Sequence, residues 1–227
     1  MPLVLHYAPG STATMPHAVI EESGLAFSLR SLDSDNGPRE RESENALELT
    51  NRIPALEDGS MVVFETGAIV LHLLTKPEAA HLMPTYGSRD YTRFLQWLFY
   101  MTTSPKMAIL EFAHPEKWTR DSQAQKLLKE AAQAKLATQC DFLDANVYSD
   151  TFLSSGFSAL DIYLTELARW SRGFAVPMWK WSRLERVITA TRQRPAFQRM
   201  LAAHGLTWPT EPPPPMTWRE KVEKYWA

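Results

Sequence analysis

The pattern of apolar residues changes once along this chain, near residue 76, and that change limits the folds it can adopt. Up to residue 76, short strand-like segments alternate with helical segments, whereas beyond it apolar residues recur only at helical spacing. Alternating strands and helices form a sheet with helices packed on it, and helices alone pack as a bundle. We therefore predict an α/β domain followed by an all-α domain.

The α/β part is predicted to run in the order β-α-β-(α)-β-β-α. Strands are expected at 3–7, 26–32, 53–56 and 61–64, and helices at 14–22, at 41–49 and from 66 onward. Asp58 and Gly59 lie between the last two strands, and because this pair tolerates positive φ it indicates a hairpin.

The helical part begins after residues 77–88, which contain two prolines and a glycine and are predicted to form a linker. Helices are expected at 90–113, with a bend at Pro105, and at 120–145, from 158, at 176–192 and at 195–203. Ser158 and Asp161 have the spacing of a capping box, with Asp in place of the usual Glu. The predicted domains are thus 1–76 and 89–205, followed by a C-terminal tail at 206–227.

Composition excludes several classes of function. The chain has 227 residues and a formal net charge of -2, so no strong positive field attracts nucleic acid or an acidic membrane. Its apolar runs are shorter than a bilayer requires and its start shows no basic leader region, so neither a membrane span nor a signal peptide is expected. Cys140 is the single cysteine, which excludes an intramolecular disulfide and fits a reducing, cytoplasmic location. His6 and His17 have no third ligand at suitable spacing, so no metal site is expected.

Residues 51–74 carry the pattern with the most chemistry. Pro54 precedes a strand and lacks an amide donor, and in the cis form it exposes the backbone of Ile53 to an extended peptide ligand. Thr66 lies where a strand passes into a helix, and the free amides there favour a carboxylate. Glu65 beside it can pair with an ammonium, so the two suit the amino-acid end of a ligand. The simpler alternative is that Thr66 only caps the helix and Glu65 is solvated.

This segment resembles the glutathione transferase family. Arg52-Ile53-Pro54-Ala55-Leu56 and, at matching spacing, Glu65-Thr66-Gly67-Ala68-Ile69 follow the family's V-P-A-L and E-S-x-A-I pattern. Ser158 with Asp161, and Arg194-Pro195-Ala196, are similar to motifs of the family's helical part. The resemblance covers residues 3–203 of the chain.

The resemblance implies a fold, a ligand and a set of contacts. The fold is a thioredoxin-like N-terminal domain with a C-terminal helical bundle, and the co-substrate is glutathione. Glu65 and Thr66 would bind the γ-glutamyl group, and Ile53, before a cis Pro54, would pair its backbone with the cysteinyl group. Arg52 belongs to the same glutathione-binding segment. The resemblance also implies a homodimer.

The sequence departs from the family at three places. Asn51 stands where the family often has Gly, Thr66 where it usually has Ser, and Glu48-Leu49 where Asn-Pro is common. Asn tolerates a left-handed backbone and Thr keeps the hydroxyl, so these departures bear on glutathione affinity more than on the fold.

The first strand-to-helix turn suggests which group activates the thiol. Pro9-Gly10-Ser11 matches insect-type and theta-like members, in which a serine follows the turn, while Pro16-His17 matches bacterial beta-type members, whose cysteine is replaced here by Thr12. A glutathione thiol has a pKa of about 8.5 to 9, and a hydroxyl donor near a helix N-terminus lowers it. Ser11 is the first candidate for this donor and Thr12 the second. The alternative is that Ser11 only caps the helix.

We therefore expect a glutathione transferase that presents a thiolate to a small, mostly apolar electrophile, as in detoxification. Tyr100, Lys106 and Met107 are expected in the substrate pocket, although aromatic and Met side chains on a helix are more often plain core. The sequence leaves open a glutathione-dependent isomerase, a disulfide reductase and a non-catalytic glutathione transferase-like binding protein, because fold alone does not decide among them. The expected partners are glutathione, a small electrophile and a second copy of the chain.

Overall fold

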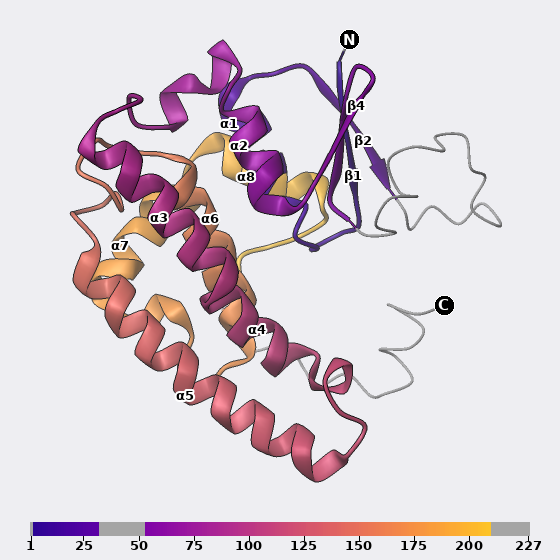
Figure 1. The fold of residues 1–227 in the computed structure, drawn as a ribbon, viewed down its shortest axis with the longest axis vertical. Helices are drawn as coiled ribbons and strands as arrows, with labels where there is room; N and C mark the ends of the chain where they lie inside the picture. Colours follow the sequence, from indigo (N-terminus) through magenta and orange to yellow (C-terminus); the bar gives the residue numbers. More distant parts are fainter. Residues whose placement is uncertain (1, 32–52, 210–227) are drawn as a thin grey trace, which may run out of the picture.

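The molecule has a sheet on one side and a body of helices on the other (Figure 1). The structure, a computed structural model, describes residues 2–31 and 53–209. Arg52, Asn51, Glu48-Leu49, the helix expected at 41–49 and the tail beyond residue 209 lie outside the described residues.

Four strands form the sheet in the order β2-β1-β3-β4. They are β1 (Leu3–Tyr7), β2 (Phe27–Ser31), β3 (Ala55–Asp58) and β4 (Met61–Phe64). β1 and β2 are parallel and are joined through the crossover helix α1 (Thr14–Ser23), whereas β3 runs antiparallel to both β1 and β4. α2 (Thr66–Leu73) follows β4 and packs beside α1 on the same face of the sheet, which makes this half thioredoxin-like.

Local chemistry explains where these elements turn. The β3–β4 hairpin turns at Gly59, whose φ of 64° lies in the left-handed region that glycine adopts freely. α1 ends at Gly24, where φ is 72° and the amide closes the last turn by donating to the carbonyl of Ile20. Leu5 of β1 and Leu56 of β3 are fully buried beneath the two helices, so the sheet and helices share one apolar core.

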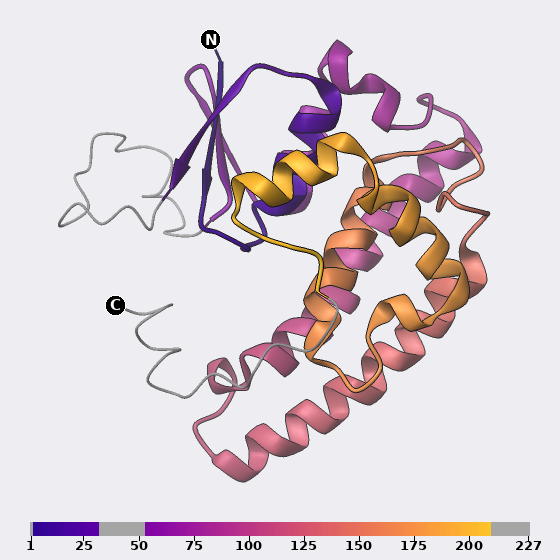
Figure 2. The same cartoon turned by 180° about the vertical axis from the view of Figure 1, so that it is seen from behind.

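The second half contains six α-helices within the described residues. They are α3 (Arg89–Thr103), α4 (Pro105–Ala113), α5 (Ser122–Asn146), α6 (Ala159–Trp170), α7 (Ser182–Arg192) and α8 (Pro195–Ala203). The 3-10 turn η1 (Pro77–Leu82) precedes α3, and η2 (Pro115–Lys117), η3 (Ser171–Gly173) and η4 (Met178–Lys180) lie between later helices. α6 is buried along almost its whole length and has α3, α4 and α7 packed around it. Both α6 and α8 lie against α1, so the helical half meets the sheet half mainly through α1 (Figure 2).

The predicted order of strands and helices is confirmed over the described residues, and two predicted helices differ from the structure. The segment expected as a single bent helix at 90–113 forms two helices, because Ser104 leaves helical geometry at φ -117° and ψ -77°. Pro105 lacks an N–H for the helical ladder and disfavours helical backbone in the residue before it. The segment expected to be helical from 176 begins its α-helix only at Ser182. None of the described helices is long and apolar enough to cross a bilayer.

The capping box predicted at Ser158 and Asp161 is present and buried at the start of α6. The Asp161 carboxylate accepts hydrogen bonds from the N–H of Phe152 at 2.7 Å, the N–H of Ser158 at 2.8 Å and the Ser158 hydroxyl at 3.0 Å. Burial raises the pKa of Asp161 to about 6, and the donors of Phe152 and Ser158 oppose that rise. This one carboxyl group therefore ties the preceding loop to the first turn of the central helix.

Replacing Asp161 by alanine is expected to lower the free energy of unfolding by about 3 kcal/mol, because two buried N–H groups lose their acceptor. Urea unfolding followed by circular dichroism measures this change. Asp150→Ala, which removes an exposed carboxylate from the same loop, is the matched control and should cost less than about 0.5 kcal/mol. Equal losses in the two variants would contradict the role assigned to Asp161.

Candidate functional site

The pairing of the strands brings three loop segments to one end of the sheet. Ala55, the first residue of β3, lies opposite His6 near the end of β1 and opposite Phe64 at the end of β4. Ile53 and Pro54 immediately precede Ala55, and Glu65 and Thr66 immediately follow Phe64. The turn that follows β1 starts at the same end of the sheet. The Ile53–Pro54 peptide bond is cis, as the resemblance implied.

Ser11 and Thr12 lie in the turn between β1 and α1 with different surroundings. The Ser11 hydroxyl oxygen accepts hydrogen bonds from the N–H of Ala8 at 3.4 Å and the N–H of Ala13 at 3.3 Å. Both bonds use the oxygen as acceptor, so they leave the Ser11 O–H proton available to a ligand. The Thr12 hydroxyl points to the carbonyl oxygen of Ile53, 3.5 Å away, which places Thr12 against the predicted peptide-binding segment.

Glu65 adopts an unusual backbone conformation between β4 and α2. Its φ is 69°, and it is the single non-glycine residue with positive φ among the described residues. A left-handed glutamate is uncommon, and such conformations gather at sites where a side chain must be aimed. The Glu65 side chain is exposed, whereas Thr66, the first residue of α2, is buried. The corner therefore offers an exposed carboxylate directly beside the N-terminus of a helix.

The three residues expected in a substrate pocket lie in different environments. Lys106 is in the first turn of α4, where burial lowers the pKa of its ammonium and the charge of Glu65 opposes that shift. Met107, next to it, is partly buried. Tyr100 instead packs edge-on against Trp97 and Phe142, and burial raises the pKa of its hydroxyl. The structure thus brings Lys106 toward the Glu65 corner and places Tyr100 in an aromatic cluster between α3 and α5.

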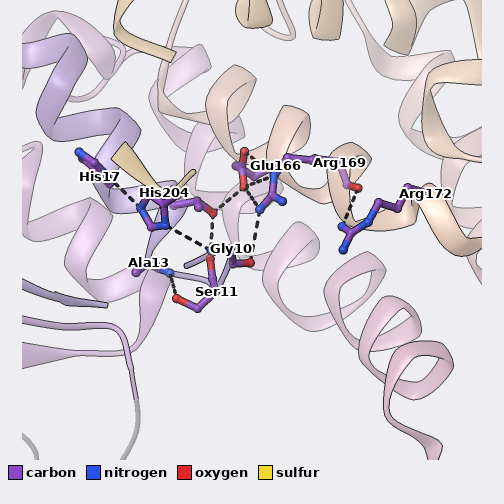
Figure 3. Close-up of polar contacts among 9 residues, drawn as sticks. Gly10, Ser11, Ala13, His17, Glu166, Arg169, Arg172 and His204 are labelled. Carbon is purple, nitrogen blue, oxygen red and sulfur yellow. Dashed lines mark hydrogen bonds and ion pairs between the residues drawn. The ribbon is translucent and has the colours of Figure 1, made fainter. Parts of the chain in front are cut away.

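A buried ion pair of α6 holds the Ser11 turn from the helical side (Figure 3). Arg169 and Glu166 form three N–H···O contacts of 2.8 to 3.1 Å and are both almost fully buried. The Thr14 hydroxyl donates to Glu166 Oε2 at 2.5 Å, and Arg169 Nη2 donates to the carbonyl oxygen of Gly10 at 3.4 Å. This pair was not identified from the sequence, although two opposite charges three residues apart in a mostly apolar helix are a recognisable signal.

Two histidines from distant parts of the chain meet beside the same turn. His204, just after α8, accepts from the N–H of Gly10 at its Nδ1, 3.3 Å away, and its Nε2 lies 3.0 Å from Nδ1 of His17 in α1. His17 Nε2 lies 3.5 Å from a carboxylate oxygen of Glu21. His204 was absent from the predicted site because its position just after α8 carries no motif.

Burial keeps both histidines neutral. It lowers the pKa of His204 to about 3, aided by the charge of Arg169 and by His17, and it lowers the pKa of His17 despite the carboxylate of Glu21. The edge of the Tyr7 ring covers the remaining side of His204. Within the described residues, no three His, Cys, Asp or Glu side chains gather to hold a metal ion.

Comparison with known proteins gives a consistent result. The family model for the glutathione S-transferase N-terminal domain matches residues 1–75. Glutathione S-transferase APIC of Nicotiana tabacum is 30% identical over 170 residues, which cover 74% of this chain and 71% of the relative. Glutathione S-transferase GstA of Escherichia coli O157:H7 is 22% identical over 206 residues, 89% of this chain and 98% of the relative. A sphingomonad glutathione S-transferase solved in complex with glutathione is 25% identical with a TM-score of 0.74, covering 90% of this chain and 100% of the other.

The chain belongs to the glutathione S-transferase family. The resemblance noted in the sequence is therefore confirmed, and so is the fold it implied, a thioredoxin-like half followed by a helical half. The shared fold extends over the helices beyond residue 75, which the family model does not reach.

The unfolding free energy of this protein is expected to fall with acidity because of His204. Its pKa is about 3 in the folded protein and about 6.5 when unfolded, so unfolding takes up a proton between these values. The contribution of His204 to the unfolding free energy is therefore complete above pH 6.5 and is lost as the pH falls below it. For this one group the loss is at most about 1.4 kcal/mol per pH unit. Urea unfolding of the wild type and of His204→Asn at pH 7 and pH 4.5 measures how much unfolding free energy each protein loses. Asp161 titrates in both proteins, so its contribution cancels in the comparison.

The wild type should lose more stability than His204→Asn over this pH range, because asparagine does not titrate. His17 and Arg169, which face His204 from α1 and α6, and Glu21, which faces His17, remain in both proteins. Parallel pH profiles for the two proteins would show that His204 is not kept neutral by the fold.

Proposed function

We propose that this protein is a glutathione transferase that binds glutathione at the sheet end formed by Ile53–Pro54, Glu65–Thr66 and the Ser11 turn. The observation that carries the proposal is the strand register, since Ala55 is paired with both His6 and Phe64 and these pairings bring the three segments together. A tripeptide with charged ends needs a backbone edge, an anion site and a carboxylate within a short span, and these segments supply all three groups.

Each segment is proposed to bind one part of glutathione. The exposed Glu65 carboxylate pairs with the γ-glutamyl ammonium, and the amide N–H groups at the start of α2, beside Thr66, donate to the γ-glutamyl carboxylate. The backbone of Ile53 pairs with the cysteinyl group. This places the glutathione sulfur toward the Ser11 turn, because Thr12 reaches the carbonyl of Ile53 from that turn. Arg52 remains a predicted contributor to the same segment.

Ser11 is the proposed donor to the thiolate. Its oxygen already accepts two backbone N–H groups, which polarise the hydroxyl and strengthen the remaining O–H as a donor. The Thr12 proton is directed at Ile53, so Thr12 is the second candidate and has to rotate before it can bond sulfur. One charge-assisted hydrogen bond, together with the partial positive charge at the start of α1, is enough to lower the thiol pKa by about two units.

In the proposed reaction, the glutathione thiol loses its proton to solvent and the thiolate sulfur attacks an electrophilic carbon. The sulfur–carbon bond forms as the leaving group departs with its electron pair, or as a conjugated double bond accepts the electrons and the resulting carbanion takes a proton from solvent. Cys140 takes no part, since it is buried in α5 and burial raises the pKa of its thiol. A mixed disulfide between protein and glutathione is therefore not a step. Tyr100, Lys106 and Met107 stay predictions for the electrophile pocket.

We also propose a cytoplasmic homodimer. Three large apolar side chains are unusually exposed on the β4 edge and on α3, namely Met61 at 54%, Phe64 at 41% and Phe99 at 57%. β4 is an edge strand, and α3 lies close to it because α2, which follows β4, packs against both. Apolar groups gathered on an exposed edge indicate a protein interface. Sedimentation equilibrium tests the dimer, which a purely monomeric distribution would exclude.

Ser11→Ala is expected to raise the thiol pKa of bound glutathione by about one to two units, which lowers the thiolate fraction at pH 7 by about 3- to 50-fold. Calorimetry first establishes that the wild type binds glutathione. Thiolate absorbance of the complex against pH then gives the thiol pKa. Thr12→Val, which removes a hydroxyl but keeps the side-chain shape, should change that pKa by less than half a unit.

The reverse result, with Thr12→Val raising the thiol pKa and Ser11→Ala leaving it unchanged, would exchange the two roles. Absence of binding at millimolar glutathione would favour the non-catalytic binding protein. Binding with an unshifted thiol pKa would contradict the proposed activation.

A further inference from the structure

Gly10 is bonded on both sides by side chains from the helical half. Its N–H donates to His204 Nδ1 at 3.3 Å, and its carbonyl oxygen accepts from Arg169 Nη2 at 3.4 Å. Its φ is 72°, and a Cβ here would meet the side chain of Leu206 at 3.6 Å. The two peptide groups that flank Gly10 are therefore held by residues from 159 and 194 positions away in the sequence.

The bond from Gly10 also fixes the protons on the two histidines. Because an N–H donates to Nδ1 of His204, a neutral His204 carries its own proton on Nε2. That proton is donated to Nδ1 of His17, which leaves the His17 proton on Nε2, facing Glu21. The result is a one-directional series of donors that runs from the Gly10 N–H through His204 to His17 (Figure 3). The Nε2 of His17 lies 3.5 Å from a Glu21 carboxylate oxygen but makes no hydrogen bond with the described residues.

We propose that His204 is a positioning residue for the Ser11 hydroxyl, with His17 holding the His204 ring in place. This inference rests on the proposed function of Ser11. The peptide group whose carbonyl belongs to Gly10 supplies the N–H of Ser11, so an altered Gly10 conformation moves Ser11 directly. The Ser11 hydroxyl oxygen accepts two long hydrogen bonds, from the N–H groups of Ala8 at 3.4 Å and Ala13 at 3.3 Å, while the Ser11 backbone is bonded to Ala8 and Thr14. The Gly10 peptide sets the direction in which that backbone enters the turn. A fixed Gly10 is therefore needed to aim the Ser11 hydroxyl.

A packing role alone does not account for this histidine. His204 is almost fully buried, and burial of an imidazole is unfavourable unless both ring nitrogens have partners. Here one nitrogen bonds the turn and the other bonds α1. A phenyl ring fills a similar space and can keep the edge contact with Tyr7, at a ring-centroid distance of 4.8 Å, but it accepts no hydrogen bond. Substitutions at His204 can therefore distinguish the effect of the ring's shape from the effect of its hydrogen-bond acceptor.

The test compares His204→Phe, which keeps the ring and loses the acceptor, with His204→Asn, whose Oδ1 can replace Nδ1 as the acceptor for Gly10. The full-length variants are assayed for the thiol pKa of bound glutathione and for kcat and KM with a general electrophile, 1-chloro-2,4-dinitrobenzene. His81→Asn, an exposed histidine on η1, is the control and should leave all three unchanged.

His204→Phe is expected to lower the thiolate fraction at neutral pH and kcat by about tenfold, with the KM for glutathione within about threefold of wild type. His204→Asn should restore both values to near wild type. If the wild type lowers the thiol pKa of glutathione and His204→Phe leaves that pKa unchanged, the positioning role of His204 is wrong while the proposed function stands. A wild type that does not lower the thiol pKa overturns the proposed function, and the inference with it.

A second measurement does not require a folded variant. Long-range proton–nitrogen correlation spectra of the wild-type protein report which ring nitrogen carries the proton. The inference expects the Nε2–H form for both His204 and His17, and slow hydrogen exchange at the Gly10 amide. An Nδ1–H His204 or a rapidly exchanging Gly10 amide overturns it, because the proposed donor series then does not exist.

Discussion

The antiparallel pairing of β3 with both β1 and β4 is the constraint on which the candidate site depends. Either pairing alone would position one neighbouring strand. Together they bring the ends of β1 and β4 and the start of β3 to the same end of the sheet. A shift of one residue would turn Leu56 out of the core, so the apolar pattern that stabilises the sheet also fixes the site's geometry. The residues proposed to bind the ligand lie in the short segments that adjoin these strand ends.

The interface between the halves is the second determinant. α1 contacts α6 and α8, and its N-terminal turn is bonded by a buried ion pair and by a histidine from that interface. Breaking a buried ion pair leaves an unpaired charge in a dry environment, which is strongly unfavourable. The relative position of the two halves is therefore coupled to the conformation of the turn, and substitutions in α6 are expected to act on chemistry that the sheet half supplies.

The sequence predicted the elements well and the site in part. Strong local signals, such as Asp58-Gly59 and the Ser158–Asp161 capping box, identified the hairpin and a helix start because their chemistry acts within four residues. The break at Ser104 was underestimated, since a proline can bend or end a helix and packing decides which. His204 could not be predicted, because its partners Gly10 and His17 are brought to it only by the docking of α8 on α1.

The burial of Cys140 has a practical consequence. The chain has one cysteine, and it lies within the packed core, so the protein carries no sulfhydryl within easy reach of an alkylating reagent. In a mixture of this protein with its proposed tripeptide, a maleimide or iodoacetamide would report the ligand's own sulfur, free of background from side chains. Oxidants that inactivate enzymes with a cysteine at the active centre should, for the same reason, leave this one working.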